Sequence, residues 1–512
     1  MTEASQRILL STSRNLDGRS AWGMALARLQ SEGHRLVALS GSALPLGGEE
    51  RSDVRSIPHN IRTLAGVPSS FSRTALADYS AYRFSPGYAE THTMLMLMMS
   101  RVDSTGTFRA LDREVLARKM HLEIFTALAE SQPTLAIFDV TPHEAMDFAL
   151  MRVLEWRKIP QLMFQPSLVG PQVMARTSLT ATLPLVLDKD FVSQHQVTVD
   201  AVREIAESSI DRLAHGTGTP KMDNQKAKEA RVGSLPSRVR AFRYSLRRLR
   251  TPGRDVKFAL TGHASIPRWL RRLMELLLER SLRLSLRERI DALPSLDRAP
   301  EGRFVLFALH YEPERSSIPE GYPFDSQLDA IVAVRKALPD SVTLLVKEHF
   351  SQKASALRGF VGRSLLFYDL LRDLPGVTVL GTATNTRALM RSAECVMTFT
   401  GKVGIEAALE GTRVIFLGQP WWGAMPGAVN FHELRSYEDF LDLPAAPVPK
   451  VRKWLSHQIC ESLLPGVSSV PPERHSKRIA QLPPGFDEVE AEGIVVATHA
   501  VMARAETSSG GK

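Results

Sequence analysis

Short apolar runs alternate with amphipathic segments along most of the 512-residue chain. An apolar run bounded by Gly, Pro or polar residues predicts a buried strand, and apolar positions three or four residues apart predict a helix. In the first part of the chain this pattern predicts strands at 7–13, 35–40, 134–140 and 161–165, and helices at 21–32, 93–100, 111–131 and 145–157. Strand, helix and strand in this order form β-α-β units, which are typical of a doubly wound parallel sheet.

The same alternation returns, more regularly, after residue 300. It predicts strands at 304–309, 342–347, 377–380, 395–400 and 414–417, and helices at 326–338, 361–372, 386–392 and 403–410. Strands that alternate with helices predict a second parallel sheet, covered by helices on both faces. Two further helices are expected at 451–464 and 487–505.

The fold class expected from this pattern is α/β, with two Rossmann-like domains that face a cleft and a basic helical connector between them. The predicted divisions are an N-terminal domain at 1–210, the connector at 211–300, a C-terminal domain at 301–445, and C-terminal helices with a tail at 446–512. Ligands of open α/β sheets bind at the C-terminal ends of the strands. We therefore expect the chemistry of the protein in the loops that follow the strands.

Charge is concentrated in the predicted connector. The chain carries a net charge of +9, but residues 221–290 alone contain 19 Lys and Arg against 6 Asp and Glu, so the remainder is net negative. A basic segment of this kind suits an anionic partner such as a membrane surface, a nucleic acid or a charged polymer. No nucleic-acid-binding module accompanies the charge, so we expect no nucleic-acid partner.

Within this segment, residues 266–290 predict a basic amphipathic helix. Trp269, Leu270, Leu273, Met274 and Leu277 recur at helical spacing with Arg between them. One interpretation is an interfacial helix on an anionic membrane, which the Arg run at 238–250 favours. The other interpretation, slightly preferred from the sequence, is a helix packed on the protein by its Leu face, with Arg stems covering the edge.

Neither a membrane span nor a secretory signal is expected. No stretch of about 18 apolar residues occurs, and the N-terminus lacks a basic start followed by an apolar core. The two cysteines, Cys395 and Cys460, are far apart and have no metal-ligand spacing. We expect a cytoplasmic protein without a metal ion or other cofactor.

Four polar stretches fall at the ends of predicted strands in the second half. They are HYEPE at 310–314, KEH at 347–349, TGKVGIEA at 400–407 and GQPWWG at 418–423. Because parallel strands end at the same edge of a sheet, we expect these stretches to lie together. Their convergence is stronger support for a site than any one of them alone.

Two of these stretches have residues suited to a phosphate. Thr400, Gly401 and Gly404 lie where a strand turns into a helix, with Glu406 one turn further on, and such a turn exposes backbone N–H groups. The alternative is that both glycines only permit close packing and that Glu406 is a solvated acid. Lys347 and His349 leave their strand on one face and supply a cation and an imidazole, although a strand-edge Lys and a loop His are equally consistent with the pattern.

Carboxylates and histidines mark two further strand ends. His310, Glu312 and Glu314 surround Pro313, which stiffens the loop, so a carboxylate there can act as a base or bind sugar hydroxyls. A turn with solvated acids is the alternative. In the first half, Asp139 and His143 frame another strand end and are candidates for acceptor binding or proton transfer. The catalytic candidates are therefore Glu314, His143 and Asp139.

These motifs resemble those of bacterial capsular polysaccharide biosynthesis proteins, which include the Kdo transferases that act on capsule lipid anchors. The resemblance rests on HYEPE followed by SSIP, on VKEH, and on the TG-x-VG-x-EA loop before GTRVIFLG. The first-half stretches MLMLMMSRVD and FDVTPHEAMDFAL add to it. It implies a glycosyltransferase-B fold with a nucleotide sugar bound mainly to the C-terminal domain.

The resemblance also implies roles for individual residues. His349 falls at a His-Pro motif that contacts the donor phosphate, Glu314 at the Glu of a Gln-Pro-Glu type motif, and Thr400 with Gly401 at a phosphate loop. Two positions depart from the pattern, since Phe350 follows His349 where proline is expected and Glu312 stands in place of glutamine.

The function expected from the sequence is transfer of a sugar from a nucleotide-activated donor, such as a CMP-linked ulosonic acid, to a glycan or glycolipid acceptor during capsule assembly. Peripheral contact with an anionic membrane through 238–290, at the inner face of the plasma membrane, accompanies this expectation. The alternatives are a nucleotide-sugar 2-epimerase-like enzyme and a non-catalytic, membrane-associated assembly partner.

Overall fold

The computed structural model describes residues 5–14, 16–41, 54–58, 64, 70–103, 109–167, 169–183, 185, 187–216, 268–355, 357–442, 445–467 and 482–509. The chain divides into two compact units. Unit 1 comprises Met1–Leu95, Glu114–Ile210 and Leu455–Lys512, and unit 2 comprises Met96–Arg113 and Asp211–Trp454. The chain therefore leaves unit 1, builds most of unit 2, and returns to unit 1 after residue 454.

Unit 1 contains a seven-stranded sheet in the order β13-β6-β5-β4-β1-β2-β3. Its strands are β1 (Arg7–Ser11), β2 (Arg35–Ser40), β3 (Arg55–Ile57), β4 (Leu135–Phe138), β5 (Gln161–Pro166), β6 (Gln172–Arg176) and β13 (Leu464–Pro465). Five neighbouring strands are parallel: β3, β2, β1, β4 and β5. Strand β6 runs antiparallel to β5, and β13 runs antiparallel to β6. The strand order reverses between β1 and β4, which makes their C-terminal ends the switch point of this sheet.

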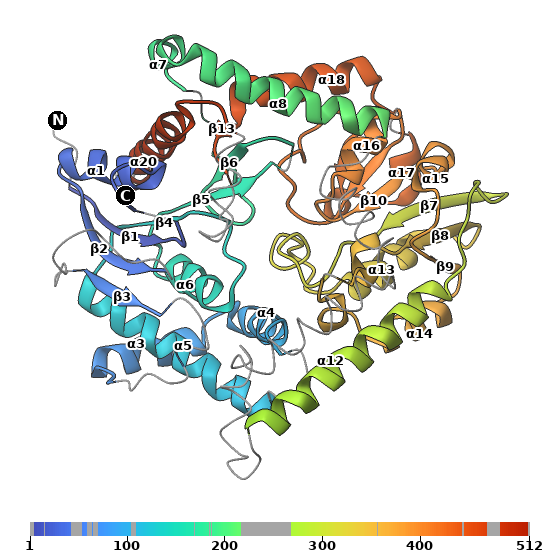
Figure 1. The fold of residues 1–512 in the computed structure, drawn as a ribbon, viewed down its shortest axis with the longest axis horizontal. Coiled ribbons are helices and arrows are strands. Elements are labelled where there is room, and N and C mark those ends of the chain that lie inside the picture. Colours follow the sequence, from blue (N-terminus) through green and yellow to red (C-terminus); the bar gives the residue numbers. More distant parts are fainter. Residues whose placement is uncertain are drawn as a thin grey trace. The chain divides into compact units, whose positions relative to one another are not determined.

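The helices of the first part of the chain and of its C-terminal part are α1 (Ala21–Ser31), α3 (Arg73–Arg83), α4 (Tyr88–Ser100), α5 (Ala110–Ser131), α6 (Ala145–Trp156), α7 (Lys189–Gln194), α8 (Gln196–His215), α18 (Val448–His457) and α20 (Phe486–Ser509). The alternation of side chains along β1 sends Ile8 and Leu10 into a core that they share with α1 and α20. Figure 1 shows α20 beside α1, although more than 450 residues separate them in sequence.

Unit 2 contains a six-stranded, fully parallel sheet in the order β12-β11-β10-β7-β8-β9. Its strands are β7 (Arg303–Ala308), β8 (Val342–Lys347), β9 (Val377–Leu380), β10 (Val396–Thr398), β11 (Val414–Phe416) and β12 (Ala428–Asn430). Numbered from β7, the order reads 3-2-1-4-5-6, which is that of a dinucleotide-binding fold with its switch point between β7 and β10. The expected α/β class with two Rossmann-like domains is confirmed.

Helices and short turns connect these strands in the expected alternation. They are α12 (Arg268–Asp291), α13 (Gln327–Ala337), the 3-10 turns Phe350–Lys353, Gly359–Val361 and Phe431–Glu433, α14 (Leu365–Asp373), α15 (Thr386–Ser392), α16 (Val403–Leu409) and α17 (Tyr437–Asp442). The side chains of Ser326, Ser364 and Asn385 accept hydrogen bonds from the first turns of α13, α14 and α15, which explains where these helices begin. The core of unit 2 joins Val305 and Phe307 of β7 to both neighbouring strands and to α13 and α14.

The basic amphipathic helix predicted at 266–290 is present as α12, but its apolar face is not packed as preferred from the sequence. Leu273, Met274 and Leu277 are 36%, 49% and 57% exposed. The side that faces unit 2 carries Leu286 and Ile290 instead. The side chain of Trp269 and the Arg run at 238–250 lie outside the described residues. Among the helices that the structure describes, none is long and apolar enough to cross a membrane.

Candidate functional site at the C-terminal edge of the second sheet

The four polar stretches predicted to converge do follow four neighbouring strands of unit 2. HYEPE follows β7, KEH ends β8, TGKVGIEA follows β10 and GQPWWG follows β11, and these strands stand in the order β11-β10-β7-β8. All of them therefore lie at the C-terminal edge of one parallel sheet, on both sides of its switch point. This edge is where ligands of such sheets bind.

His310 fastens two of these loops to each other. Its Nε2 accepts the backbone N–H of Thr400 at 3.3 Å and lies 3.0 Å from Oγ1 of Thr398, while Nδ1 lies 3.2 Å from Oγ of Ser316. Burial, with a smaller contribution from the nearby Arg363 charge, lowers the pKa of His310 to about 4. The imidazole is therefore neutral at pH 7 and joins the loops after β7 and β10 from inside. A direct contact of His310 with a donor stays a prediction.

Arg363 is a buried cation that the sequence did not single out. Its Nη1 lies 2.9 Å from Oε2 of Glu312, its Nη2 donates to the carbonyl of His310 at 3.1 Å, and its Nε lies 3.4 Å from Oε2 of Glu348. Glu348 also accepts the hydroxyl of Tyr368 at 2.6 Å. Glu312, which stands where the resemblance expects glutamine, is therefore half of an ion pair. Its role as a donor ligand stays a prediction.

Gln352 completes the connection between the loops after β7 and β8. Its Oε1 accepts the backbone N–H of Glu312 and its Nε2 donates to the carbonyl of Glu312, both at 2.9 Å. A side-chain amide that pairs with both backbone groups of one residue imitates a strand neighbour and fixes that residue's orientation. Two residues further on, Glu314 is exposed, so the loop presents one carboxylate to solvent and holds the other in an ion pair.

KEH places its three charged or titratable side chains at two depths. Glu348 is fully buried, whereas Lys347 and His349 are half-buried. Nδ1 of His349 accepts the backbone N–H of Ser351 at 3.1 Å, so the neutral ring carries its proton on Nε2. An Nε2–H group is a hydrogen-bond donor, which is what an oxygen of a phosphate requires.

Glu406 lies in the electrostatic field of the same cations. Burial raises its pKa, and the charges of Lys402, Arg387 and Lys347 oppose that rise. The carboxylate of α16 and the ammonium group at the end of β8 are thus close enough to interact. The charge of Lys347 at the end of β8 therefore acts on Glu406 in the first turn of α16, although the two residues are distant in sequence.

The glycines of the loop after β10 are required by close packing. A Cβ on Gly401 would lie 2.8 Å from Oγ1 of Thr398 and 3.3 Å from the imidazole of His310, and one on Gly404 would lie 2.3 Å from the ring of Trp422. The hydroxyl of Thr400 donates to the carbonyl of Ser316 at 3.0 Å. Both glycines therefore permit close packing, as one interpretation of the sequence expected. Phosphate binding by this loop stays a prediction.

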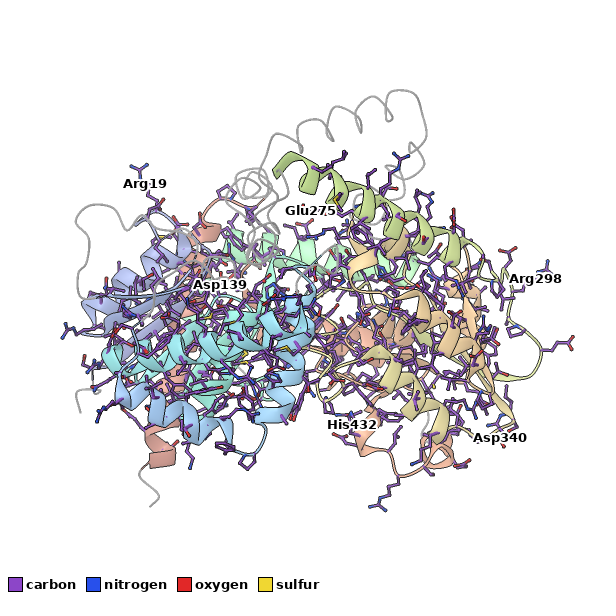
Figure 2. All side chains as sticks on the ribbon, turned by 90° about the horizontal axis from the view of Figure 1, so that it is seen from below. Arg19, Asp139, Glu275, Arg298, Asp340 and His432 are labelled. Carbon is purple, nitrogen blue, oxygen red and sulfur yellow. The ribbon has the colours of Figure 1, made fainter. Side chains whose placement is uncertain are left out.

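In unit 1, Asp139 and His143 follow β4 at the switch point. Asp139 accepts the hydroxyl of Thr12 at 3.0 Å and the backbone N–H of Ser13 at 3.2 Å, and burial raises its pKa. Figure 2 shows Asp139 among crowded side chains, whereas Arg19 of the same unit projects outward. The carboxylate therefore holds the loop after β1. His143 is half-buried, and its Nδ1 donates to the carbonyl of Thr141 at 3.1 Å, which leaves Nε2 as the basic nitrogen.

Elsewhere in unit 1, one group of side chains has the composition of a metal site. The ligand atoms of Glu32, His34 and His499 lie within 4.8 Å of one another. However, the backbone N–H of Gln6 donates to Nδ1 of His34, and a histidine that binds a metal through Nε2 normally donates from Nδ1. Glu32 and His499 are already paired at 2.8 Å. The geometry therefore fits a Glu32–His499 contact beside a histidine that accepts from the backbone better than it fits a metal ion.

The residues that sequence reasoning missed are Arg363, Glu348 and Gln352. A signal for Glu348 was present, because a carboxylate that directly follows the apolar run VTLLV is placed at a buried strand end. Arg363 and Gln352 had no such signal, since they lie in the irregular segment between β8 and α14. We expected α14 to begin at 361, whereas it begins at Leu365, after the loop that carries Arg363.

Comparisons with known proteins agree with the motifs. Residues 225–438 match the family model described as "Capsule polysaccharide biosynthesis protein". A search of curated proteins found no match.

Similar solved structures include a Thermosulfurimonas dismutans KpsC, beta Kdo 2,7 transferase, at 11% identity, covering 70% of this chain and 89% of that chain, with a TM-score of 0.27. A beta Kdo 2,4 transferase KpsC of the same organism has 13% identity, 63% and 78% coverage, and a TM-score of 0.26. A Methanocaldococcus jannaschii UDP-GlcNAc 2-epimerase has 12% identity, 88% and 98% coverage, and a TM-score of 0.20. Likenesses this distant carry no argument about function.

The family match spans β7 to β12 and the four loops of the candidate site. The resemblance to capsular polysaccharide biosynthesis proteins that the motifs predicted is therefore confirmed over residues 225–438.

Proposed function

We propose that the protein is a glycosyltransferase of capsular polysaccharide biosynthesis, and that unit 2 binds its nucleotide-activated sugar donor. The observation that carries the proposal is the position of Lys347, His349 and Glu406 at the C-terminal edge of a 3-2-1-4-5-6 sheet, on the two sides of its switch point and inside the segment that matches the capsule family. A cation and an imidazole N–H suit the phosphate groups of a donor. A carboxylate at the start of the following helix suits the hydroxyls of a ribose.

For the chemical step, we propose Glu314 as the carboxylate that acts on the sugar. It is exposed at the same sheet edge, and the loop that carries it is held by Arg363, Gln352 and His310 from below. A general base or a stabiliser of a cationic sugar needs this combination of a fixed backbone and an accessible carboxylate.

In unit 1, we propose that His143 serves proton transfer on the acceptor side, because its proton is held on Nδ1 and Nε2 is basic. Asp139 belongs to the same switch point and holds the loop after β1. A CMP-linked ulosonic acid is the proposed donor, and a glycan or glycolipid the proposed acceptor. Peripheral association with an anionic membrane at the inner face of the plasma membrane is part of the same proposal.

Two other functions share part of this support. A nucleotide-sugar 2-epimerase would use the same fold and phosphate residues, and it would interconvert a UDP-sugar without any acceptor. A non-catalytic assembly partner would bind membranes but no nucleotide. Incubation of the purified protein with UDP-sugars alone, followed by chromatography of the sugars, separates the epimerase from the transferase.

The proposal is tested by nucleotide binding and by two matched substitutions. In a thermal-shift series with CMP, UDP, CMP-sugars and UDP-sugars, a ligand at about 100 times its Kd stabilises the protein by about 2.7 kcal/mol. His349→Ala should weaken binding of that ligand at least tenfold by calorimetry, whereas His432→Ala, at an exposed histidine of the same unit, should not. Glu314→Gln should keep the affinity and lower turnover about a hundredfold.

Unchanged affinity in His349→Ala would remove the phosphate assignment. Near-normal turnover in Glu314→Gln would leave Glu314 as a loop residue without a catalytic role.

A further inference from the structure

α12 exposes apolar side chains to solvent and buries two carboxylates. Helices of soluble proteins usually bury their apolar side chains and expose their charged ones. Leu277 is 57% exposed, whereas Glu275 and Glu279 are each only 5% exposed (Glu275 is labelled in Figure 2). The other exposed apolar side chains of the helix are Leu273, Met274, Leu278, Leu282 and Leu284. A helix of a soluble protein normally turns such a stripe toward the core. We call these six residues the α12 apolar face.

The α12 apolar face covers one half of a well-anchored helix. At 100° per residue its members fall within about 180° of the helix surface, on the side opposite Leu286 and Ile290. Those two residues belong to the core of unit 2, and Arg283 packs over the ring of Phe360. With 24 residues the helix is about 36 Å long. The exposed face is therefore held in place by packing on the other side.

A second helix extends the apolar surface. Arg289 of α12 forms an ion pair with Asp369 of α14, and α14 lies beside α12 in unit 2 (Figure 1). Leu365, Leu366 and Leu370 of α14 are 37%, 74% and 45% exposed. Two neighbouring helices thus both expose apolar side chains, and exposed apolar patches mark interaction sites.

The charge of this region favours an anionic bilayer over a second copy of the chain as the binding partner of this surface. Residues 221–290 carry 19 Lys and Arg against 6 Asp and Glu, and Arg280 lies exposed beside the α12 apolar face. A second copy of the chain would bring the same positive segment against itself, and the two would repel each other. A surface that is both anionic and able to take up leucine side chains fits both properties, and a bilayer with anionic lipids is such a surface.

We propose that α12 lies in the plane of an anionic lipid bilayer and inserts its apolar face among the lipid headgroups and upper acyl chains. The proposal extends the membrane association proposed above, because it assigns binding to described leucines in addition to the basic charge. It does not depend on the nucleotide assignment. Insertion would hold the sheet edge of unit 2 near a membrane that contains a glycolipid.

The decisive variant removes apolar surface and keeps every charge. In Leu277→Gln/Leu278→Gln/Leu282→Gln, all three side chains are already exposed and glutamine is a good helix former, so the fold should persist. A matched control carries Leu76→Gln/Leu111→Gln/Val332→Gln, at exposed apolar positions outside α12 and α14. Full-length proteins are floated with phosphatidylcholine vesicles with and without 30% phosphatidylglycerol, at low and high salt.

We expect the wild-type protein and the control to float with the anionic vesicles. The α12 variant should partition at least tenfold less, with its thermal unfolding and its thermal shift with nucleotide unchanged. A fluorophore on Leu277→Cys, in a Cys460→Ser background, should show a blue shift on anionic vesicles, whereas one on Val332→Cys should not.

Equal flotation of the α12 variant and the wild type would overturn the proposal. So would equal binding to neutral and anionic vesicles, or a concentration-dependent dimer without vesicle binding. A thermal shift with nucleotide but no vesicle binding would reject the membrane proposal and leave the glycosyltransferase proposal unaffected. Vesicle binding without any thermal shift by nucleotides would reject the donor-binding proposal and leave the membrane proposal unaffected.

Discussion

Arg363 joins two loops that meet at the candidate site, and its surroundings are almost dry. Its side chain is 1% exposed, and its carboxylate partners Glu348 and Glu312 are 0% and 14% exposed. The guanidinium is the cation that pairs with both of these carboxylates. The position of the loop that carries Glu314 therefore depends on a cation that does not reach the solvent.

We expect Arg363→Met to lower the free energy of unfolding by about 3 to 5 kcal/mol, because it leaves buried carboxylates without a counter-charge. Arg372→Met is the matched control, since Arg372 of α14 is 66% exposed and pairs only with surface acids. Its loss should stay within about 1 kcal/mol. Urea unfolding of both variants measures the difference, and equal effects would show that the buried pairs contribute no more than surface ones.

At the scale of residues, the sequence identified where the chemistry lies better than what each side chain does. His310, Lys347, His349 and Glu314 stand out because polar groups at the ends of apolar runs are unusual, and all lie at the predicted edge. The partners that define their states are far away in sequence. Glu312 meets a cation 51 residues later, and no local pattern encodes such a meeting.

At the scale of elements, the turn from β10 into α16 depends on the absence of a side chain at Gly404. Because the ring of Trp422 occupies the space of a Cβ at 2.3 Å, Gly404→Ala forces the ring or the helix to move. We expect a loss of about 1 to 3 kcal/mol in the free energy of unfolding. Trp422→Leu should recover part of that loss in the double variant, as expected for residues in contact.

Gly18→Ala is the control for this prediction, since a Cβ on Gly18 meets no atom within 4 Å. Thermal unfolding of the four variants gives the comparison. A Gly404→Ala protein as stable as the wild type would mean that the β10–α16 turn adjusts without cost.

Periodicity predicted most elements of both sheets. The strands β2, β8 and β9 and the helix α15 have the expected bounds, because their apolar runs end at charged residues, Gly or Pro. Short pairings in the antiparallel part escaped prediction. β13 has two residues, too few for any alternation to show, and β6 is defined by its pairing with β5 as much as by its composition. The exposure of the α12 apolar face was not predicted for another reason. Residue spacing shows which face of a helix is apolar, but it does not show which face is covered by the rest of the protein.

At the scale of the whole molecule, each unit has a buried neutral histidine that resists protonation. Burial lowers the pKa of His121 in unit 1 and that of His310 in unit 2 to about 4. In the unfolded chain a histidine titrates near pH 6.5. Between pH 6.5 and 4 the unfolded state therefore binds more protons than the folded state, and each histidine destabilises the fold as pH falls.

Buried carboxyls with raised pKa values, such as Asp139 and Glu490, act in the opposite direction. The prediction therefore concerns a difference between two proteins. From pH 7 to pH 5, the wild type should lose about 2 kcal/mol more of its free energy of unfolding than His310→Gln does. Urea unfolding at both pH values measures this difference, and parallel pH profiles would contradict a neutral buried His310.

The arrangement of the chain in two units was only partly accessible to sequence reasoning. The two alternations of strands and helices predicted two sheets, because a parallel sheet must be built from repeated crossovers. The return of residues 455–512 to unit 1 was not predicted. Nothing in the apolar pattern of α20 states that its partner is α1, although Ile494 and Val495 share a core with α1.

The return of residues 455–512 to unit 1 determines the order in which the two units can be completed during synthesis on the ribosome. Unit 2 is encoded within unit 1, so all of its strands are synthesised before β13 and α20. During that interval the nascent chain carries β6 as an unpaired edge and the α1 face of the first sheet without its cover. Exposed edges and apolar faces of this kind are the surfaces that chaperones recognise. Unit 1, whose synthesis begins first, is thus completed last, after unit 2, which carries the candidate site.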